Sequence, residues 1–400
     1  MKSSISSRSF YLVIITFILL SVLGQVSTGI YTPFFQELAT LHSSGIGMIE
    51  KSVAIFLIAF SVSQLLSGVA CDYLNKTRLL QAGLLLFMLG TLLVALANTP
   101  QVFLAGRIIQ GLGGGVGVSV TRAFSKQLFS PQQLNVSLSL TNIAFSIAPA
   151  VAPLIGTLVG HYAGITAIFG VVLCLALLAF WLLFYIAPQL DSQHKPRSLH
   201  VISETLALMR TCLPRILLVG VASGLLYGIV FGFVTVSPSL LMDEHHFSKT
   251  AFSLFSLLAT LCFVLGSYLN IRLQTVSAVY KFKLSGLIIL GLSCCTLLWL
   301  TTMSSNTLWG TLLLGYLAFF FAGIAMPCSV SLMLSFSNTS AGFLAALVGF
   351  FHLSGASIGA YLVATINMPP ALTFVMVTTL LSFCSVMACA VVHPAHNEQD

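Results

Sequence analysis

The chain has 400 residues, of which 58% are hydrophobic and only 6% are charged, and its formal net charge is +7. About a quarter of the residues in a soluble globular domain are charged, so this composition excludes a soluble globule and indicates a polytopic membrane protein. Excess positive charge is also typical of nucleic-acid-binding proteins, but in a membrane protein the basic residues must first be assigned to a side of the bilayer.

Twelve apolar windows, each long enough to cross a bilayer as a helix, predict an all-α membrane protein with twelve transmembrane helices. They cover residues 10–31, 53–70, 79–97, 102–121, 136–159, 165–186, 216–236, 250–269, 282–302, 308–334, 342–366 and 371–392. The only long polar interruption lies between the sixth and seventh windows. We therefore predict an N-terminal six-helix bundle over 1–186, a cytoplasmic linker over 187–213 and a C-terminal six-helix bundle over 214–400.

The two halves carry similar sequence marks at corresponding places. Gly68-x-x-x-Asp72 closes the second predicted helix and Gly266-x-x-x-Asn270 closes the eighth, and basic residues follow each of them. This correspondence indicates an internal repeat. Two helix bundles related by a repeat are typical of secondary transporters, in which a site near the bilayer midplane is exposed to each side in turn.

The basic residues are distributed unevenly between the two sides of the predicted membrane. Of the sixteen Lys and Arg residues, thirteen fall on the side of the N-terminus, whereas only Lys51 and Lys249 fall on the other and Arg107 lies within a helix. By the positive-inside rule, this distribution predicts that both termini are cytoplasmic. A nucleic-acid partner is not needed to explain the net charge.

The fourth predicted helix combines a charge with a run of glycines. A guanidinium in hydrocarbon costs at least about 2.5 to 3.5 kcal/mol, so Arg107 is expected to face a cavity or a partner rather than lipid. Gly111 and Gly115 lie four residues apart, as do Gly113 and Gly117. This spacing lets a neighbouring helix approach closely, and we interpret the glycines as packing residues.

Two further segments suggest moving parts. Pro149 and Pro153 in the fifth predicted helix each remove a backbone donor and bend the helix, either as a fixed kink or as a hinge. Asp72, in the loop before the third helix, has Lys76 and Arg78 as possible partners. A solvated loop charge is the alternative interpretation of Asp72.

Five segments in chain order resemble the major facilitator superfamily and, within it, the drug:proton antiporters of the Bcr/CflA type. The segments are Gly68-x-x-x-Asp72-x-x-x-Lys76-x-Arg78, Arg107-x-x-Gln110-Gly111-x-Gly113, Ala148-Pro149-Ala-Val-Ala-Pro153-Leu-Ile-Gly156, Phe231-Gly-Phe-Val-Thr-Val-Ser237-Pro238 and Ala341-Gly342-x-x-Ala345-Ala346-Leu347-x-Gly349. The resemblance extends over most of the chain and implies the major facilitator fold of two six-helix bundles.

The resemblance also implies roles for individual residues, because the first, fourth, seventh and tenth helices of the family line a central cavity. The substrate-binding residues that it implies are Arg107, Gln25, Tyr31, Gln110, Tyr227 and Phe231. The gating residues that it implies are Gly68, Asp72, Lys76, Arg78, Pro149 and Pro153. A cavity with aromatic walls and few charges suits small amphipathic molecules, although aromatic side chains also face lipid.

The chain departs from the family's pattern in its acidic residues. Gly29 stands where relatives often carry an acid, Gln127 replaces another acid, and no Asp or Glu lies at the centre of a predicted helix. His352 stands where relatives tend to have glutamine, and its unperturbed pKa is near physiological pH. His352 is therefore the candidate proton-coupling residue, with a hydrogen-bonded packing role as the alternative.

The favoured function is proton-coupled efflux of small amphipathic, drug-like compounds across the bacterial inner membrane. The alternative is an uncoupled facilitator or importer of a small solute, which includes an anion held by Arg107. A membrane receptor or an intramembrane enzyme is not expected, because the chain lacks a His-Glu-x-x-His stretch, paired intramembrane aspartates and a nucleophile with a base. ATP is not the expected energy source, because a phosphate-cradling loop is absent. We expect no metal or cofactor and no required oligomer; the expected partners are a small-molecule substrate, protons and membrane lipid.

Overall fold

The computed structural model describes residues 7–71, 73–191, 199–302, 307–336 and 341–390, and every regular element in these ranges is a helix. Within these ranges, eleven helices are long and apolar enough to cross a membrane, and the number rises to twelve if the bent pair within α6 (Pro131–Ala163) is one span. The predicted all-α fold with twelve transmembrane helices is confirmed on that count.

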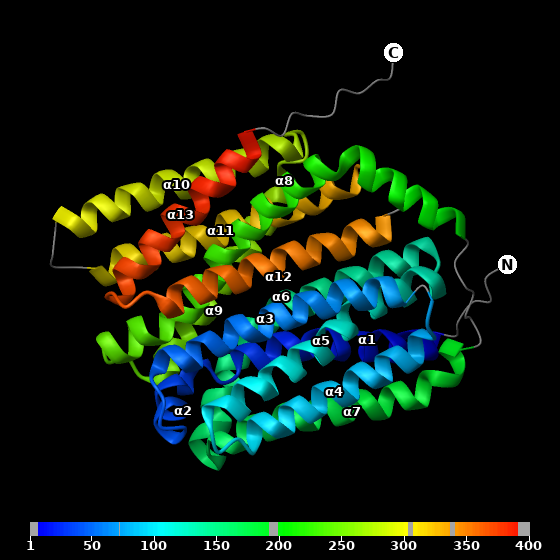
Figure 1. Cartoon of the computed structure of the whole chain (residues 1–400), viewed down its shortest axis with the longest axis horizontal. Coiled ribbons are helices and arrows are strands. Elements are labelled where there is room, and N and C mark those ends of the chain that lie inside the picture. Colours follow the sequence, from blue (N-terminus) through cyan, green and yellow to red (C-terminus); the bar gives the residue numbers. More distant parts are fainter. Residues whose placement is uncertain (1–6, 72, 192–198, 303–306, 337–340, 391–400) are drawn as a thin grey trace. The chain divides into compact units, whose positions relative to one another are not determined.

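The chain divides into two compact units, each a bundle of long helices (Figure 1). Unit 1 holds the residues up to Ser198 and also Phe247–Leu257, and unit 2 holds Leu199–His246 and the residues from Leu258 onward. Apart from α6, the elements of unit 1 are α1 (Ser7–Gly29), η1 (Thr32–Phe34), α2 (Phe35–Leu41), α3 (Ile46–Ala70), α4 (Lys76–Ala95), α5 (Pro100–Leu128) and α7 (Ile165–Asp191). Those of unit 2 are α8 (Leu199–Pro238), η2 (Ser239–Glu244), α10 (Ala278–Thr302), α11 (Thr307–Leu334), α12 (Ala341–Thr365) and α13 (Pro370–Ala390).

One helix belongs to both units. The helix α9 (Lys249–Arg272) begins in unit 1 and ends in unit 2. In its first turns Lys249 forms an ion pair with Glu37 of α2 and lies 4.1 Å from the ring centre of Phe34. The hydroxyls of Ser253 and Thr157 lie 3.0 Å apart. The first turns of α9 are therefore held by α2, η1 and α6.

The predicted linker, residues 187–213, overlaps the end of α7, the start of α8 and residues 192–198, which lie outside the described ranges. The limits of the linker and its cytoplasmic position stay predictions.

Several helices begin before the apolar windows because polar caps precede them. Asn75 Oδ1 accepts the Arg78 N–H at 3.0 Å at the start of α4. Thr99 Oγ1 accepts the Val102 N–H at 3.4 Å, and Thr99 directly precedes Pro100, the first residue of α5. Such caps satisfy donors that the first turn leaves unpaired, so the helix extends beyond its hydrophobic stretch.

The glycines of α5 bring its backbone against three other helices of unit 1. A β-carbon at Gly113 would lie 2.2 Å from the Phe87 nitrogen of α4, and one at Gly115 would lie 2.4 Å from the Phe60 carbonyl of α3. At Gly117 it would lie 2.4 Å from a carbonyl of α1. The glycines are packing residues, as expected, but Gly113 and Gly117 contact different helices rather than sharing one face.

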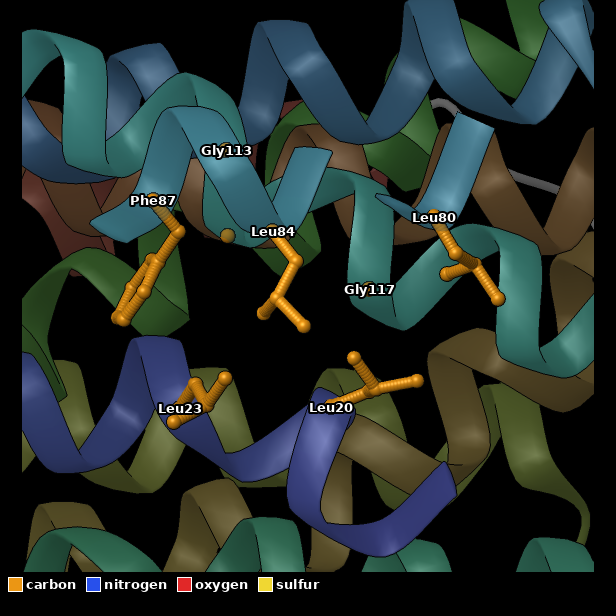
Figure 2. A pocket seen from close by; sticks show the side chains of 8 residues that line it. Leu20, Leu23, Leu80, Leu84, Phe87, Gly113 and Gly117 are labelled. Carbon is orange, nitrogen blue, oxygen red and sulfur yellow. The ribbon is translucent and has the colours of Figure 1, made fainter. Parts of the chain in front are cut away.

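A small apolar cavity of about 10 Å³ lies beside these contacts. Figure 2 shows leucines of α1 and α4 facing each other across it, with the glycines of α5 alongside. Its walls are Leu20, Leu23, Leu80, Leu84, Phe87, Gly113, Gly114 and Gly117. An apolar gap of this size holds no ordered water and no ligand, so we interpret it as a packing gap.

The helix α6 is bent by 49° between Val136–Pro149 and Val151–Ala163, in agreement with the bend predicted from its prolines. Its second segment, Val151–Ala163, packs closely on α1, since a β-carbon at Gly29 would lie 3.1 Å from the Ala152 β-carbon. Any side chain at position 29 would therefore require α1 or α6 to shift by a few tenths of an ångström to admit its β-carbon. Whether the bend moves stays a prediction.

The helix contact at Gly113 generates a stability prediction. Replacing Gly113 with Ala should lower the stability of the solubilised protein by about 1 to 3 kcal/mol, because the methyl group would overlap a backbone nitrogen. The matched control is Gly170→Ala in α7, where no described atom beyond its own stretch of helix lies within 4 Å of the added carbon. Thermal unfolding in detergent measures both, and equal unfolding temperatures for the two variants would contradict the close approach of α4 and α5.

His42, just after α2, generates a prediction about pH. Its side chain is buried, its Nδ1 has no hydrogen-bond partner among the described residues, and burial lowers the pKa of the imidazole below its usual 6.5. The unfolded chain then binds the proton more readily, so stability should fall as pH drops below about 6.5 and be unaffected above it. In thermal unfolding at pH 8 and pH 5, His42→Asn should reduce this loss and the exposed-site control His161→Asn should not. An unchanged loss in His42→Asn would contradict the assignment.

Candidate functional site

Arg107 is buried in unit 1, two turns into α5. Its side chain has 0% exposure. Nη1 donates to the Ser27 carbonyl of α1 at 3.1 Å and to Gln110 Oε1 at 2.5 Å. None of its contacts in the described part of the chain is a carboxylate, so the positive charge is compensated only by dipoles and rings.

Aromatic rings flank the guanidinium. Its central carbon lies 4.3 Å from the ring centre of Phe56 on α3 and 4.8 Å from that of Tyr31. A cation over a desolvated aromatic face gains about 2 kcal/mol, which offsets part of the cost of burying it. The two rings pack against the guanidinium, while Ser27 and Gln110 hold it at Nη1.

The other edge of the guanidinium is unpaired. Arg107 Nε and Nη2 are buried and have no hydrogen-bond partner among the described residues. These atoms form the side edge of the planar group, whose two N–H bonds point the same way and match a carboxylate or phosphate oxygen pair. The described structure therefore contains one buried, charged fork that lacks an acceptor.

Tyr31 is held in turn by a serine. Its hydroxyl lies 2.8 Å from Ser52 Oγ, and Ser52 donates its own proton to the Ile49 carbonyl at 2.5 Å. Because a serine hydroxyl has only one proton, Tyr31 must be the donor to Ser52. The ring of Tyr31 also packs near Phe35, Phe103 and Phe169, and this packing fixes its face against Arg107.

The predicted substrate-binding residues of the first half are only partly brought together. Arg107, Tyr31 and Gln110 form one contiguous cluster. Gln25 is buried on α1, two residues before Ser27, but the contacts described for Arg107 do not include it. Sequence reasoning missed Ser27, Phe56 and Thr91, the last of which accepts a hydrogen bond from Gln110 Nε2 at 2.9 Å.

Unit 2 contains a second cluster, made by α8, α11 and α12. The ring of Tyr227 lies 5.3 Å from that of Phe231 and 5.5 Å from that of His352. His352 Nε2 lies 3.1 Å from Ser329 Oγ, and Ser329 donates to the Met326 carbonyl at 2.8 Å. Ser329 therefore accepts from Nε2–H, and in the neutral imidazole this tautomer has its lone pair on Nδ1. All three predicted site residues of the second half lie together.

Of the predicted gating residues, Gly68, Lys76 and Arg78 lie on either side of the junction of α3 and α4, whereas Pro149 and Pro153 lie within α6. Gly68 accepts a hydrogen bond from the Cys71 thiol, and Lys76 is buried with its ammonium group 6.0 Å from the ring centre of Phe124. Arg78 is exposed. Asp72 lies outside the described residues, so its pairing with Lys76 or Arg78 stays a prediction.

Comparison with known proteins identifies relatives that are named as resistance proteins. A bicyclomycin resistance protein homolog of Haemophilus influenzae is 26% identical over 270 residues, which are 67% of this chain and 68% of that protein. Multidrug resistance protein MdtL of Citrobacter koseri is 23% identical over 321 residues, 78% of each chain. Multidrug resistance protein D of Escherichia coli is 29% identical over 132 residues, 33% of this chain and 34% of that protein.

A solved structure and a family model also match this chain. A crystal structure described as peptide transporter POT in complex with sulfate covers 98% of this chain and 96% of that chain with a TM-score of 0.73. At 14% identity this match shows the fold alone. The model of the Major Facilitator Superfamily matches residues 15–360, and the relatives' names are consistent with the Bcr/CflA type. The chain therefore belongs to the major facilitator superfamily and is a membrane transporter.

Proposed function

We propose that the protein exports small amphipathic, drug-like compounds across the bacterial inner membrane in exchange for protons. The names of relatives, bicyclomycin resistance and multidrug resistance proteins, support this class of substrate. In this proposal the protein performs no chemical conversion, and it needs no cofactor, nucleic acid or oligomeric partner. Both termini are cytoplasmic, which the distribution of basic residues supports.

The observation that carries the proposal is the unpaired edge of Arg107. A buried donor without an acceptor costs about 1 to 3 kcal/mol, and more when it is charged. A substrate oxygen that approaches Nε and Nη2 would recover this energy. Arg107, Tyr31 and Phe56 are all buried in this structure, so in the proposal the two rings would contact the rest of the molecule in a state in which the helices of unit 1 have opened. Within unit 1, this combination suits an amphipathic compound with an exposed acceptor oxygen.

In this proposal His352 carries the proton. It is an imidazole within α12 that contacts Tyr227, one of the two predicted substrate-binding residues of α8. Substrate and proton would then compete through the same aromatic cluster of unit 2. Gly68, Asp72, Lys76 and Arg78 would gate one end of the helices, and Pro149 and Pro153 would let α6 bend during the cycle.

A second candidate function is uncoupled or inward transport of a small anion. Two observations favour it: the guanidinium has no carboxylate among its described contacts, and Gly29 stands where related antiporters often carry an acid. An anion would then neutralise Arg107 directly.

Replacing Arg107 tests the binding site. In Arg107→Met the dissociation constant for bicyclomycin should rise about 10- to 100-fold, because hydrogen bonds to a charged group contribute about 1.5 to 3 kcal/mol. Arg107→Lys should restore little of this, since a lysine lacks the two-pronged edge. Isothermal titration of the solubilised protein measures the constant. The control is Arg272→Met, which removes an exposed arginine that contacts Tyr268. Undiminished binding in Arg107→Met would disprove the site.

Replacing His352 tests proton coupling. In inverted vesicles that carry a pH gradient, bicyclomycin should drive proton movement through the unaltered protein, and His352→Gln should abolish that movement while retaining uptake down a substrate gradient. A pH-sensitive dye reports proton movement and radiolabelled substrate reports uptake. His161→Gln, on an exposed site, is the control. Unchanged proton flux in His352→Gln would remove His352 from the mechanism, and uptake indifferent to the pH gradient in the unaltered protein would favour the uncoupled carrier.

A further inference from the structure

Thr91 is a fully buried residue of α4 that no motif marks, and it lies next to the Arg107 cluster. We propose that Thr91 is a positioning residue for Arg107, which it orients by fixing the direction of the Gln110 side-chain amide. The proposal concerns the shape of the site and depends on the proposed function only in that the site binds substrate.

Thr91 can only accept a hydrogen bond from Gln110. A threonine hydroxyl has one proton to donate and two lone pairs that accept. The Thr91 proton goes to the Phe87 carbonyl of its own helix at 2.7 Å. Toward Gln110, 2.9 Å away, Thr91 can therefore only accept. The group that faces it must be the NH₂ of the Gln110 amide.

The other end of the Gln110 amide faces Arg107. With its NH₂ on Thr91, Gln110 must point Oε1 the opposite way, and there it accepts from Arg107 Nη1 at 2.5 Å. The reversed amide would set an NH₂ donor against a guanidinium donor. Thr91 thus excludes the arrangement in which Gln110 repels Arg107, although Thr91 makes no contact with Arg107 itself.

The contacts of Arg107 fix the orientation of its guanidinium. The two bonds from Nη1, to Gln110 and to the Ser27 carbonyl, fix the direction of the planar group, and its central carbon lies over the rings of Phe56 and Tyr31. A planar group held by two hydrogen bonds at one nitrogen and packed against two rings has its remaining edge fixed as well. That edge carries Nε and Nη2, the donors without a partner. The hydrogen bonds from Thr91 through Gln110 to Arg107, which we call the relay, therefore present the unpaired fork in one orientation.

The relay requires the backbones of α4 and α5 to be close together. A β-carbon at Gly90, the residue before Thr91, would lie 2.2 Å from the Gln110 nitrogen. Only at this separation does the short threonine side chain reach the Gln110 amide. A serine at position 91 retains both the reach and the hydroxyl, whereas a valine retains the shape and loses the hydroxyl.

The experiment combines these variants with a spectroscopic readout that needs no ligand. In protein labelled with nitrogen-15 at arginine only, and with the Arg107 signals assigned by Arg107→Lys, a held guanidinium gives separate Nη resonances. Thr91→Val should merge them, and Thr91→Ser should keep them separate. The matched control is Thr16→Val, which removes another fully buried hydroxyl that donates to its own helix backbone, at Leu12, in unit 1. Thr16→Val should leave the Arg107 signals unchanged.

Binding provides the second readout. Thr91→Val should weaken bicyclomycin binding about three- to tenfold, as expected for loss of one neutral hydrogen bond. In a Gln110→Glu background the same change should leave the Arg107 signals separate, because either carboxylate oxygen pairs with the guanidinium. Separate Arg107 signals in Thr91→Val, or merged signals in Thr91→Ser, would overturn the proposal. If the unaltered protein does not bind bicyclomycin, the proposed substrate fails, but the resonance test still decides the role of Thr91.

Discussion

A positive charge buried without a carboxylate among its described contacts is the constraint on which the structure of unit 1 depends. Arg107 must be compensated by weaker partners, and these come from separate helices: a carbonyl of α1, a ring of α3 and an amide of its own helix that α4 orients. All of them must approach α5 closely. The glycines of α4 and α5 make that approach possible, so the packing and the site are consequences of the same sequence feature.

Hydroxyls bonded to their own helix recur at three points of the candidate sites. Thr91, Ser52 and Ser329 each donate to a carbonyl three or four residues earlier, and each can then only accept from a side chain on another element. Their partners are Gln110, Tyr31 and His352. A membrane protein with few charges can direct its polar groups in this way, since within hydrocarbon no water competes for the hydroxyl proton.

The sequence predicts the number of helices and the importance of Arg107 because both depend on local composition. Long apolar windows are visible along the chain, and a charge within one of them is conspicuous. Short elements such as α2 and η2, and polar starts such as that at Asn75, lie outside such windows and were not predicted. Thr91 could not be recognised either, since hydroxyls are common in apolar helices and its role depends on which helix faces it. Gln25 was expected near Arg107 from the family resemblance alone, and the contacts described for Arg107 do not include it.

The central claim is that the unpaired edge of Arg107 is where the transported molecule binds. Cryo-electron microscopy of the protein with bicyclomycin bound would test it most directly. The account predicts that an acceptor oxygen of the compound lies within hydrogen-bond distance of Arg107 Nε or Nη2, between the rings of Tyr31 and Phe56. A bound compound elsewhere, with both nitrogens still unpaired or bonded only to a protein side chain, would contradict it.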